Sequence, residues 1–212
     1  MKKKKNQNLN KRRIEIINLS KDLIIKYGWN DLLFQKISEN KNINLKELNA
    51  LFSNGYKEMI VVFFDNLNKE LEYKYKNHNF FKIPIHKRIR TILISKLLII
   101  EKEKTLFKRT FNYLLIPGNY KLLIKLIYKS VSIIWYISND KSTDFNFYSK
   151  RMILAGIYIT VVMNLLNSSM FEAEKKLDYL LHKVSKIPKI KAKFTSLIIE
   201  RPFFNMIRRY RT

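Results

Sequence analysis

The chain has 212 residues, of which 47% are hydrophobic and 28% charged, and its 42 lysines and arginines against 17 acidic residues give a formal charge of +25. So apolar a chain can bury a sizeable core, which excludes wholesale disorder, and its four glycines and four prolines disfavour turn-rich β architectures. The lack of cysteine excludes disulfides and cysteine metal sites. The charge suits nucleic acid or anionic lipid as a partner, but codon-driven accumulation of lysine on solvated faces explains it equally well.

The N-terminal third reads as short helices followed by a long one. The basic stretch 1–9 has no apolar run after it, which predicts a disordered tail and no secretory signal. Apolar residues at helical spacing then predict a first helix that ends at Gly28, where glycine supplies a left-handed cap. Two short helices follow, the second over about 44–51, and a long helix covers about 56–76.

The rest of the chain repeats the helical pattern, with breaks at prolines, glycine and asparagine-rich stretches. The most apolar run, Met152 to Leu166, is shorter than the roughly 20 residues of a membrane span, so a buried helix is expected there. The predicted helices cover about 84–102, 104–115, 119–138, 144–167, 171–186 and 190–209. The predicted parts are a basic tail (1–9), a degenerate helix-turn-helix (10–55), a helical ligand-binding bundle (56–187) and an amphipathic membrane-associating segment (188–212).

This order of helices resembles the TetR-type fold, which makes a DNA-binding regulator the alternative function. A recognition helix presents polar and basic side chains to the bases and phosphates. The helix at 44–51 offers one lysine, Lys46, beside the phosphate-repelling Glu47, and Asn42 and Asn49 stand where a TetR-type reader has glycine and an aromatic residue. Nucleic-acid binding is therefore disfavoured.

A more specific motif lies at 135–151: Trp-Tyr-Ile-Ser-Asn-Asp-Lys-Ser-Thr-Asp-Phe-Asn-Phe-Tyr-Ser-Lys-Arg. It continues as Met-Ile-Leu-Ala-Gly-Ile-Tyr, and upstream Gly28-Trp29 and the Leu-Ile-Pro-Gly-Asn break around Pro117 come in the same order. Together these resemble the Coq-nine family, the lipid-binding accessory proteins of ubiquinone biosynthesis. The sequence departs from the family pattern at Ser53, where proline is usual, at Phe147, where tryptophan is common, and before Asp140, where a small Ala-Gly pair is usual.

The helix that starts near Asp144 carries the predicted partner site. Asp144, Phe147, Tyr148 and Arg151 are spaced i, i+3, i+4 and i+7, so they share one helix face, and an aromatic pair beside an acid and an arginine is the composition of a protein–protein hot spot. By itself the pattern is also that of an ordinary amphipathic helix. The resemblance implies that this face docks the di-iron hydroxylase that acts late in ubiquinone synthesis.

Apolar residues of the bundle are the candidate lipid-lining set. Pattern alone cannot separate a filled core from a hollow one, and the resemblance implies a pocket for an isoprenoid lipid or ubiquinone precursor. The residues are Ile133, Ile134, Trp135, Ile137, Ile153, Tyr158 and Val162.

The last segment combines apolar bulk with surrounding lysines and arginines, which suits a helix lying on an anionic membrane surface, although packing on the bundle or on a dimer partner is also compatible. The candidate membrane residues are Phe194, Leu197, Ile198, Phe203, Phe204 and Ile207.

No enzymatic chemistry is predicted. The histidines at 78, 86 and 182 are scattered; Asp178 and His182 are spaced for a pair, but a solvated surface pair is favoured over a catalytic dyad. No metal site or cofactor is expected. The sequence therefore predicts an all-α accessory protein of ubiquinone biosynthesis that binds isoprenoid lipid and presents the quinone to its hydroxylase. It would lie on the inner face of a bacterial cytoplasmic membrane, with a homodimer expected only by analogy with TetR-type bundles.

Overall fold

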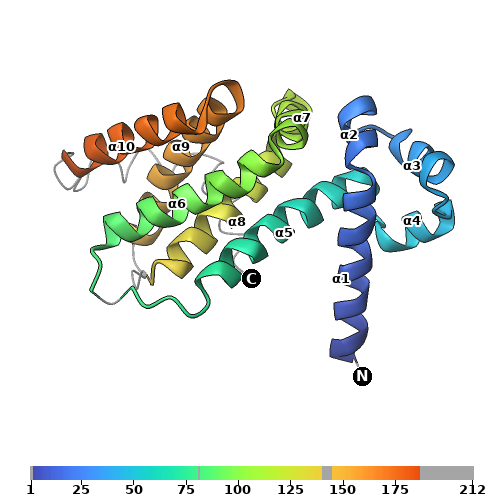
Figure 1. The fold of residues 1–212 in the computed structure, drawn as a ribbon, viewed down its shortest axis with the longest axis horizontal. Helices are drawn as coiled ribbons and strands as arrows, with labels where there is room; N and C mark the ends of the chain where they lie inside the picture. Colours follow the sequence, from blue (N-terminus) through green and yellow to red (C-terminus); the bar gives the residue numbers. More distant parts are fainter. Residues whose placement is uncertain (1, 81, 140–144, 187–212) are drawn as a thin grey trace. The chain divides into compact units, whose positions relative to one another are not determined.

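The computed structural model describes residues 2–80, 82–139 and 145–186, and these form α-helices, one short 3-10 helix and no strand (Figure 1). This confirms the all-α prediction. The helices are α1 (Lys2–Leu19), α2 (Lys21–Tyr27), α3 (Leu33–Lys41), α4 (Leu45–Leu51), α5 (Tyr56–Tyr75), α6 (Ile85–Lys102), α7 (Lys104–Leu114), η1 (Pro117–Asn119), α8 (Tyr120–Ile137), α9 (Phe145–Asn167) and α10 (Met170–Lys186).

Two expectations for the N-terminus are wrong. The basic stretch 2–9, expected to be a disordered tail, belongs to α1, because no glycine or proline separates its lysines from the apolar helix that follows. The expected single helix up to Gly28 is broken at Ser20, whose Oγ donates to the carbonyl of Ile16 at 2.7 Å. Such a local side-chain bond competes with regular helix bonding and often bends the chain.

The chain divides into two compact units, and α6 and α8 contribute residues to both. The first unit comprises Met1–Asn79 and Ser95–Leu126. In it, α1 packs on α5 and α2 packs on α7. The core includes an aromatic cluster in which Phe107 contacts Phe63, Phe64 and Phe111, with ring centroids 5.2–6.2 Å apart.

Arginines of α1 hold the short helices in place. The Arg12 Nε donates to Glu47 of α4 at 2.7 Å, and Arg13 pairs with Glu58 of α5 at 3.0 Å. The Arg13 guanidinium also lies 5.7 Å from the ring centre of Phe52. These arginines, which the charge pattern counted toward a polyanion-binding surface, are thus engaged in contacts within the first unit.

Gly28 and Trp29 form the turn that the sequence analysis singled out. Gly28 has φ +80°, and its N–H donates to the carbonyl of Ile24, which closes α2. Trp29 is buried, and its Nε1 donates to Thr110 Oγ1 of α7 at 3.0 Å. Gly28 ends the helix with a positive φ, as predicted, but its ψ of −174° lies outside the left-handed helical region of the predicted cap. The turn brings Trp29 into the core.

The second unit comprises Phe80–Ile94 and Ile127–Thr212, and within it α9 and α10 pack side by side as a helical hairpin (Figure 1). One face of α9 is buried, from Leu154 through Tyr158 and Val162 to Leu165. On α10, Asp178 accepts two bonds from Arg90 of α6, at 2.5 and 2.8 Å. Arg90 therefore engages the carboxylate that could have formed a dyad with His182.

Helix α9 is also long and apolar enough to cross a membrane over Phe147–Asn167, by length and composition alone. A little under half of its apolar window is buried within the protein. A core helix passes the same test, and Met152 to Leu166 was expected to be such a helix.

Replacing Gly28 with alanine should lower the free energy of unfolding by about 1–2 kcal/mol, and Tm by about 2–8 °C. The reason is the positive φ, together with a contact of 3.1 Å between the added Cβ and Arg109 Nη2. Urea denaturation followed by circular dichroism measures the change. Gly118→Ala is the matched control, because its Cβ would meet nothing within 4 Å and its φ is not positive. Equal losses in the two variants would contradict the assignment.

Candidate functional site

The end of α8 leads into the motif at 135–151 and is held by several bonds. Ser138 is fully buried; its Oγ donates to the carbonyl of Trp135 at 2.8 Å. The Ser138 carbonyl accepts from Arg88 Nη1 at 3.0 Å, and the Nε of Arg88 donates to the carbonyl of Ile83 at 2.6 Å. A positively charged guanidinium at this position also stabilises the C-terminal end of α8, because this end carries the negative pole of the helix dipole. Arg88 is a positioning residue that the sequence analysis missed.

Asn139 follows in the left-handed region, with φ +59°. Asparagine tolerates this conformation better than other residues with a side chain. This explains how the chain turns here although the small Ala-Gly pair of the family pattern is missing. The next five residues, 140–144, lie outside the described residues, and they include Asp144 of the predicted partner site.

The first turns of α9 bring together the other three residues of that site. The rings of Phe147 and Tyr148 meet edge to face with centroids 5.1 Å apart, and both side chains are partly exposed. Arg151 is buried; its guanidinium carbon lies 3.2 Å from the centre of the Phe147 ring, and Nη1 donates to the Phe147 carbonyl at 3.0 Å. Arg151 therefore packs against the Phe147 ring and is buried, whereas the sequence analysis placed it beside the pair on the surface.

The predicted lipid-lining residues occupy different environments in the second unit. Ile134, Trp135, Tyr158 and Val162 are buried, and Ile133 and Ile137 are half-buried. Ile153 is 40% exposed, so it does not share the interior with the others. The Lys150 ammonium lies 5.5 Å from the ring of Trp135, which links this set to the first turns of α9.

The predicted membrane residues lie outside the described part of the chain. They are Phe194, Leu197, Ile198, Phe203, Phe204 and Ile207.

The first unit contains a buried lysine that the sequence analysis did not identify. Lys96 is fully buried and its Nζ donates to Asn68 Oδ1 at 2.7 Å. Burial lowers its pKa from 10.5 to about 7, although the nearby Glu70 and Asp65 oppose this shift. A signal was available: Ile89, Ile92, Leu93, Leu97 and Ile100 mark the buried face of α6, and position 96 falls on that face.

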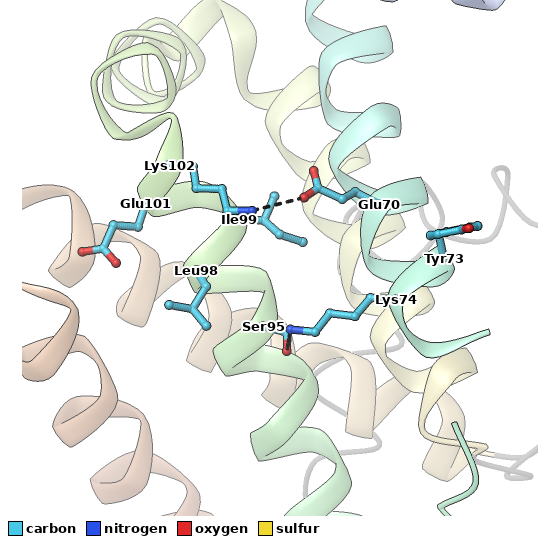
Figure 2. A pocket seen from close by; sticks show the side chains of 8 residues that line it. All are labelled: Glu70, Tyr73, Lys74, Ser95, Leu98, Ile99, Glu101 and Lys102. Carbon is cyan, nitrogen blue, oxygen red and sulfur yellow. Dashed lines mark hydrogen bonds and ion pairs between the residues drawn. The ribbon is translucent and has the colours of Figure 1, made fainter. Parts of the chain in front are cut away.

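A groove of about 510 Å³ lies between α5 and α6 in the same unit (Figure 2). Two polar bridges cross it: Lys102 pairs with Glu70 at 3.8 Å, and Lys74 Nζ donates to Ser95 Oγ at 2.9 Å. Its lining mixes both signs of charge with the exposed Tyr73. This composition neither concentrates one charge nor makes an apolar lipid pocket, and the predicted lipid-lining residues do not take part in it.

Two further observations bear on the alternatives. Among the described residues, no group of three histidine, aspartate or glutamate side chains could hold a metal ion. On α4, Glu47 is engaged by Arg12, and the exposed positions include Leu45, Lys46 and Asn49. This face carries little positive charge for contact with phosphates.

Comparisons with known proteins agree on one family. The COQ9 family model matches residues 120–191, which include α8, α9, α10 and the whole motif at 135–151. The bovine (Bos taurus) mitochondrial ubiquinone biosynthesis protein COQ9 is 34% identical over 77 residues, covering 36% of this chain and 24% of its own length. The rat (Rattus norvegicus) COQ9 protein is 24% identical over 169 residues, covering 73% of this chain and 51% of its own length. The COQ9-A protein of Xenopus laevis is 24% identical over 180 residues, covering 81% and 56%.

These observations define an all-α protein whose most specific feature is the turn and helix start at 135–151. Residues 120–191 of the chain match the COQ9 family, the Coq-nine family that the motif resembles, and the longer matches to COQ9 proteins extend this similarity over most of the chain at 24% identity. In the longer matches it spans about half the length of the curated relatives.

The buried Lys96 predicts an unusual dependence of stability on pH. Between pH 7 and 10 the unfolded chain binds a proton that the folded state lacks, so the free energy of unfolding should rise with pH in this window. Lys96→Met should abolish this rise and stabilise the protein most at pH 7 and below, by an amount on the order of a few kcal/mol. Chemical denaturation from pH 6 to 10 measures both effects. Lys69→Met, at an exposed position of α5, should keep the wild-type slope; an unchanged slope in Lys96→Met would contradict the assignment.

Proposed function

We propose that the chain is a non-enzymatic accessory protein of ubiquinone biosynthesis, which binds an isoprenoid lipid and presents the quinone intermediate to the di-iron demethoxyubiquinone hydroxylase at a membrane. The observation that carries the proposal is the COQ9 match over 120–191, which includes the residues that hold Phe147, Tyr148 and Arg151 together. The matched relatives are named ubiquinone biosynthesis proteins.

The lipid part of the proposal has a simple energetic reason. A polyprenyl tail is more stable in an apolar interior than in water by ~0.8 kcal/mol per CH₂ group. A protein that shelters the tail therefore lowers the cost of bringing the quinone ring out of the bilayer. Within the second unit, the buried Ile134, Trp135, Tyr158 and Val162 are the proposed contacts for the lipid.

The hydroxylase-binding part rests on the first turns of α9. Partly exposed aromatic side chains that are held rigidly lose little conformational entropy on binding, which makes them effective anchors at interfaces. Phe147 and Tyr148 are such a pair, and Arg151 fixes the Phe147 ring. Asp144 is proposed as a fourth contact from its place in the motif.

Membrane association and self-association complete the proposal. The apolar and basic residues at 194–207 are proposed to contact anionic lipid headgroups. On α9, the exposed Ile153 and Met163 offer an apolar strip that a second copy of the chain can cover. The bacterial cytoplasmic location stays a prediction, since the matched relatives are named mitochondrial.

The first test is the lipid content of the purified protein. Organic extraction and mass spectrometry of detergent-free protein should recover an isoprenoid lipid in an amount approaching one molecule per chain. Protein that has been denatured, washed with solvent and refolded serves as the blank. If repeated preparations contain no isoprenoid lipid and take none up from vesicles loaded with ubiquinone, lipid carriage is wrong.

The second test removes the aromatic pair. Phe147→Ala combined with Tyr148→Ala should weaken binding to the hydroxylase at least tenfold, because two rigid aromatic anchors are lost, each of which is typically worth about 1–2 kcal/mol or more at an interface. Affinity is measured by surface plasmon resonance with the immobilised hydroxylase, and helicity by circular dichroism. Tyr73→Ala is the matched control, since Tyr73 is 80% exposed in the first unit. Equal affinity of the double variant and the wild type would exclude this surface.

A further inference from the structure

A hollow of about 390 Å³ lies at the C-terminal end of α5, within the first unit. Its volume is within the range of sites that hold small molecules. It shares Tyr73 and Lys74 with the groove between α5 and α6. Among the described residues that line this α5 hollow, none is acidic. They are Tyr73, Lys74, Lys76, Asn77 and His78.

The buried Tyr75 fixes two of the groups around the α5 hollow. Its hydroxyl lies 2.7 Å from Ser95 Oγ, which accepts a hydrogen bond from Lys74 Nζ at 2.9 Å (Figure 2). The Tyr75 ring also meets the His78 ring edge to face, with centroids 5.5 Å apart. Because Ser95 is neutral, it orients the Lys74 ammonium without cancelling its charge.

Positive charge prevails at this end of α5. Lys74 and Lys76 carry two full charges, which outweigh the roughly half negative charge of a helix C-terminus. In the adjoining groove, Glu70 is paired with Lys102 at 3.8 Å, and Figure 2 shows Glu101 directed away from α5. A phosphate group carries about −1.5 to −2 charges at neutral pH and accepts hydrogen bonds from ammonium, imidazole and carboxamide N–H groups. The polar lining of the α5 hollow therefore suits a phosphate group.

Tyr73 adds an aromatic surface at the same place. Its side chain is 80% exposed and lines both the α5 hollow and the groove. An accessible aromatic ring beside lysines is the combination with which proteins bind nucleotides without reading the base, since the base stacks on the ring and the lysines contact the phosphates.

We propose that the α5 hollow binds a small molecule that carries both a phosphate or diphosphate group and an aromatic ring, as a nucleoside phosphate does. Lys74, Lys76 and His78 contact the phosphate, and Tyr73 stacks on the ring. Ser95 is a positioning residue that acts through Lys74. The inference does not depend on lipid binding or on the hydroxylase, and it gives the first unit a ligand that the proposed function does not include.

The test is isothermal titration calorimetry at physiological salt with three probes: ADP, inorganic pyrophosphate and adenosine. ADP should bind at least about fivefold more tightly than pyrophosphate, because only ADP can stack on Tyr73, and adenosine should bind most weakly. Lys74→Gln and Lys76→Gln should each weaken both phosphate probes about 3- to 10-fold, the effect of one charged hydrogen bond at an open site. Tyr73→Ala should reduce the affinity for ADP to that for pyrophosphate and leave pyrophosphate binding unchanged.

Two further variants separate a formed site from general attraction to a basic protein. Lys57→Gln removes the same charge at an exposed position in the first turn of α5 and should leave all three affinities unchanged. Ser95→Ala keeps every charge but removes the acceptor that orients Lys74, so it should weaken ADP binding about 2- to 5-fold with helicity unchanged.

Three results would overturn the inference. Equal losses in Lys57→Gln and Lys74→Gln, or full ADP affinity in Ser95→Ala, would show that net charge alone attracts the anion. Equal affinities for ADP and pyrophosphate, with no effect of Tyr73→Ala, would exclude the aromatic part of the ligand. Wild-type protein that binds neither phosphate probe at millimolar concentration has no such site, and the proposed lipid-binding function would be unaffected.

Discussion

The contact between Arg151 and Phe147 is the interaction on which the motif depends. A buried guanidinium loses its hydration and needs compensation from the protein. Arg151 receives part of it from the Phe147 carbonyl and from the face of the Phe147 ring at 3.2 Å. The same contact holds Phe147 against Tyr148, so the group that stabilises the first turns of α9 also sets the aromatic pair that is proposed to bind the hydroxylase. At the preceding helix end, Arg88 plays a comparable part by bonding the carbonyls of Ile83 and Ser138.

Each unit contains buried polar side chains whose hydrogen bonds are made within the unit. In the first unit, the Lys96 ammonium donates to Asn68, and burial lowers the pKa of Lys96. In the second, the buried Ser138 hydroxyl donates to the Trp135 carbonyl.

The large positive charge of the chain has a partly structural explanation. Arg12 and Arg13 connect α1 to α4 and α5, and Lys21 pairs with Glu103. Although the N-terminal helices follow the order of a helix-turn-helix protein, the contacts on α4 engage its glutamate with Arg12 and leave Lys46 as its cation. Charge counted along a sequence therefore overstates what this part of the surface offers to nucleic acid.

The sequence by itself determined most of the helices and the resemblance to one family. Apolar periodicity, Pro117 and the asparagine-rich breaks act within one or two helical turns, so the bounds of α6 to α10 agree with the predicted ones within two residues. The motif at 135–151 lies within the segment that matches the COQ9 family. The burial of Arg151 and Lys96 and the exposure of Ile153 were decided by the tertiary structure alone. The physical reason is that burial and hydrogen-bond satisfaction depend on which side chains arrive from other helices, and helical spacing specifies a face without specifying what covers it.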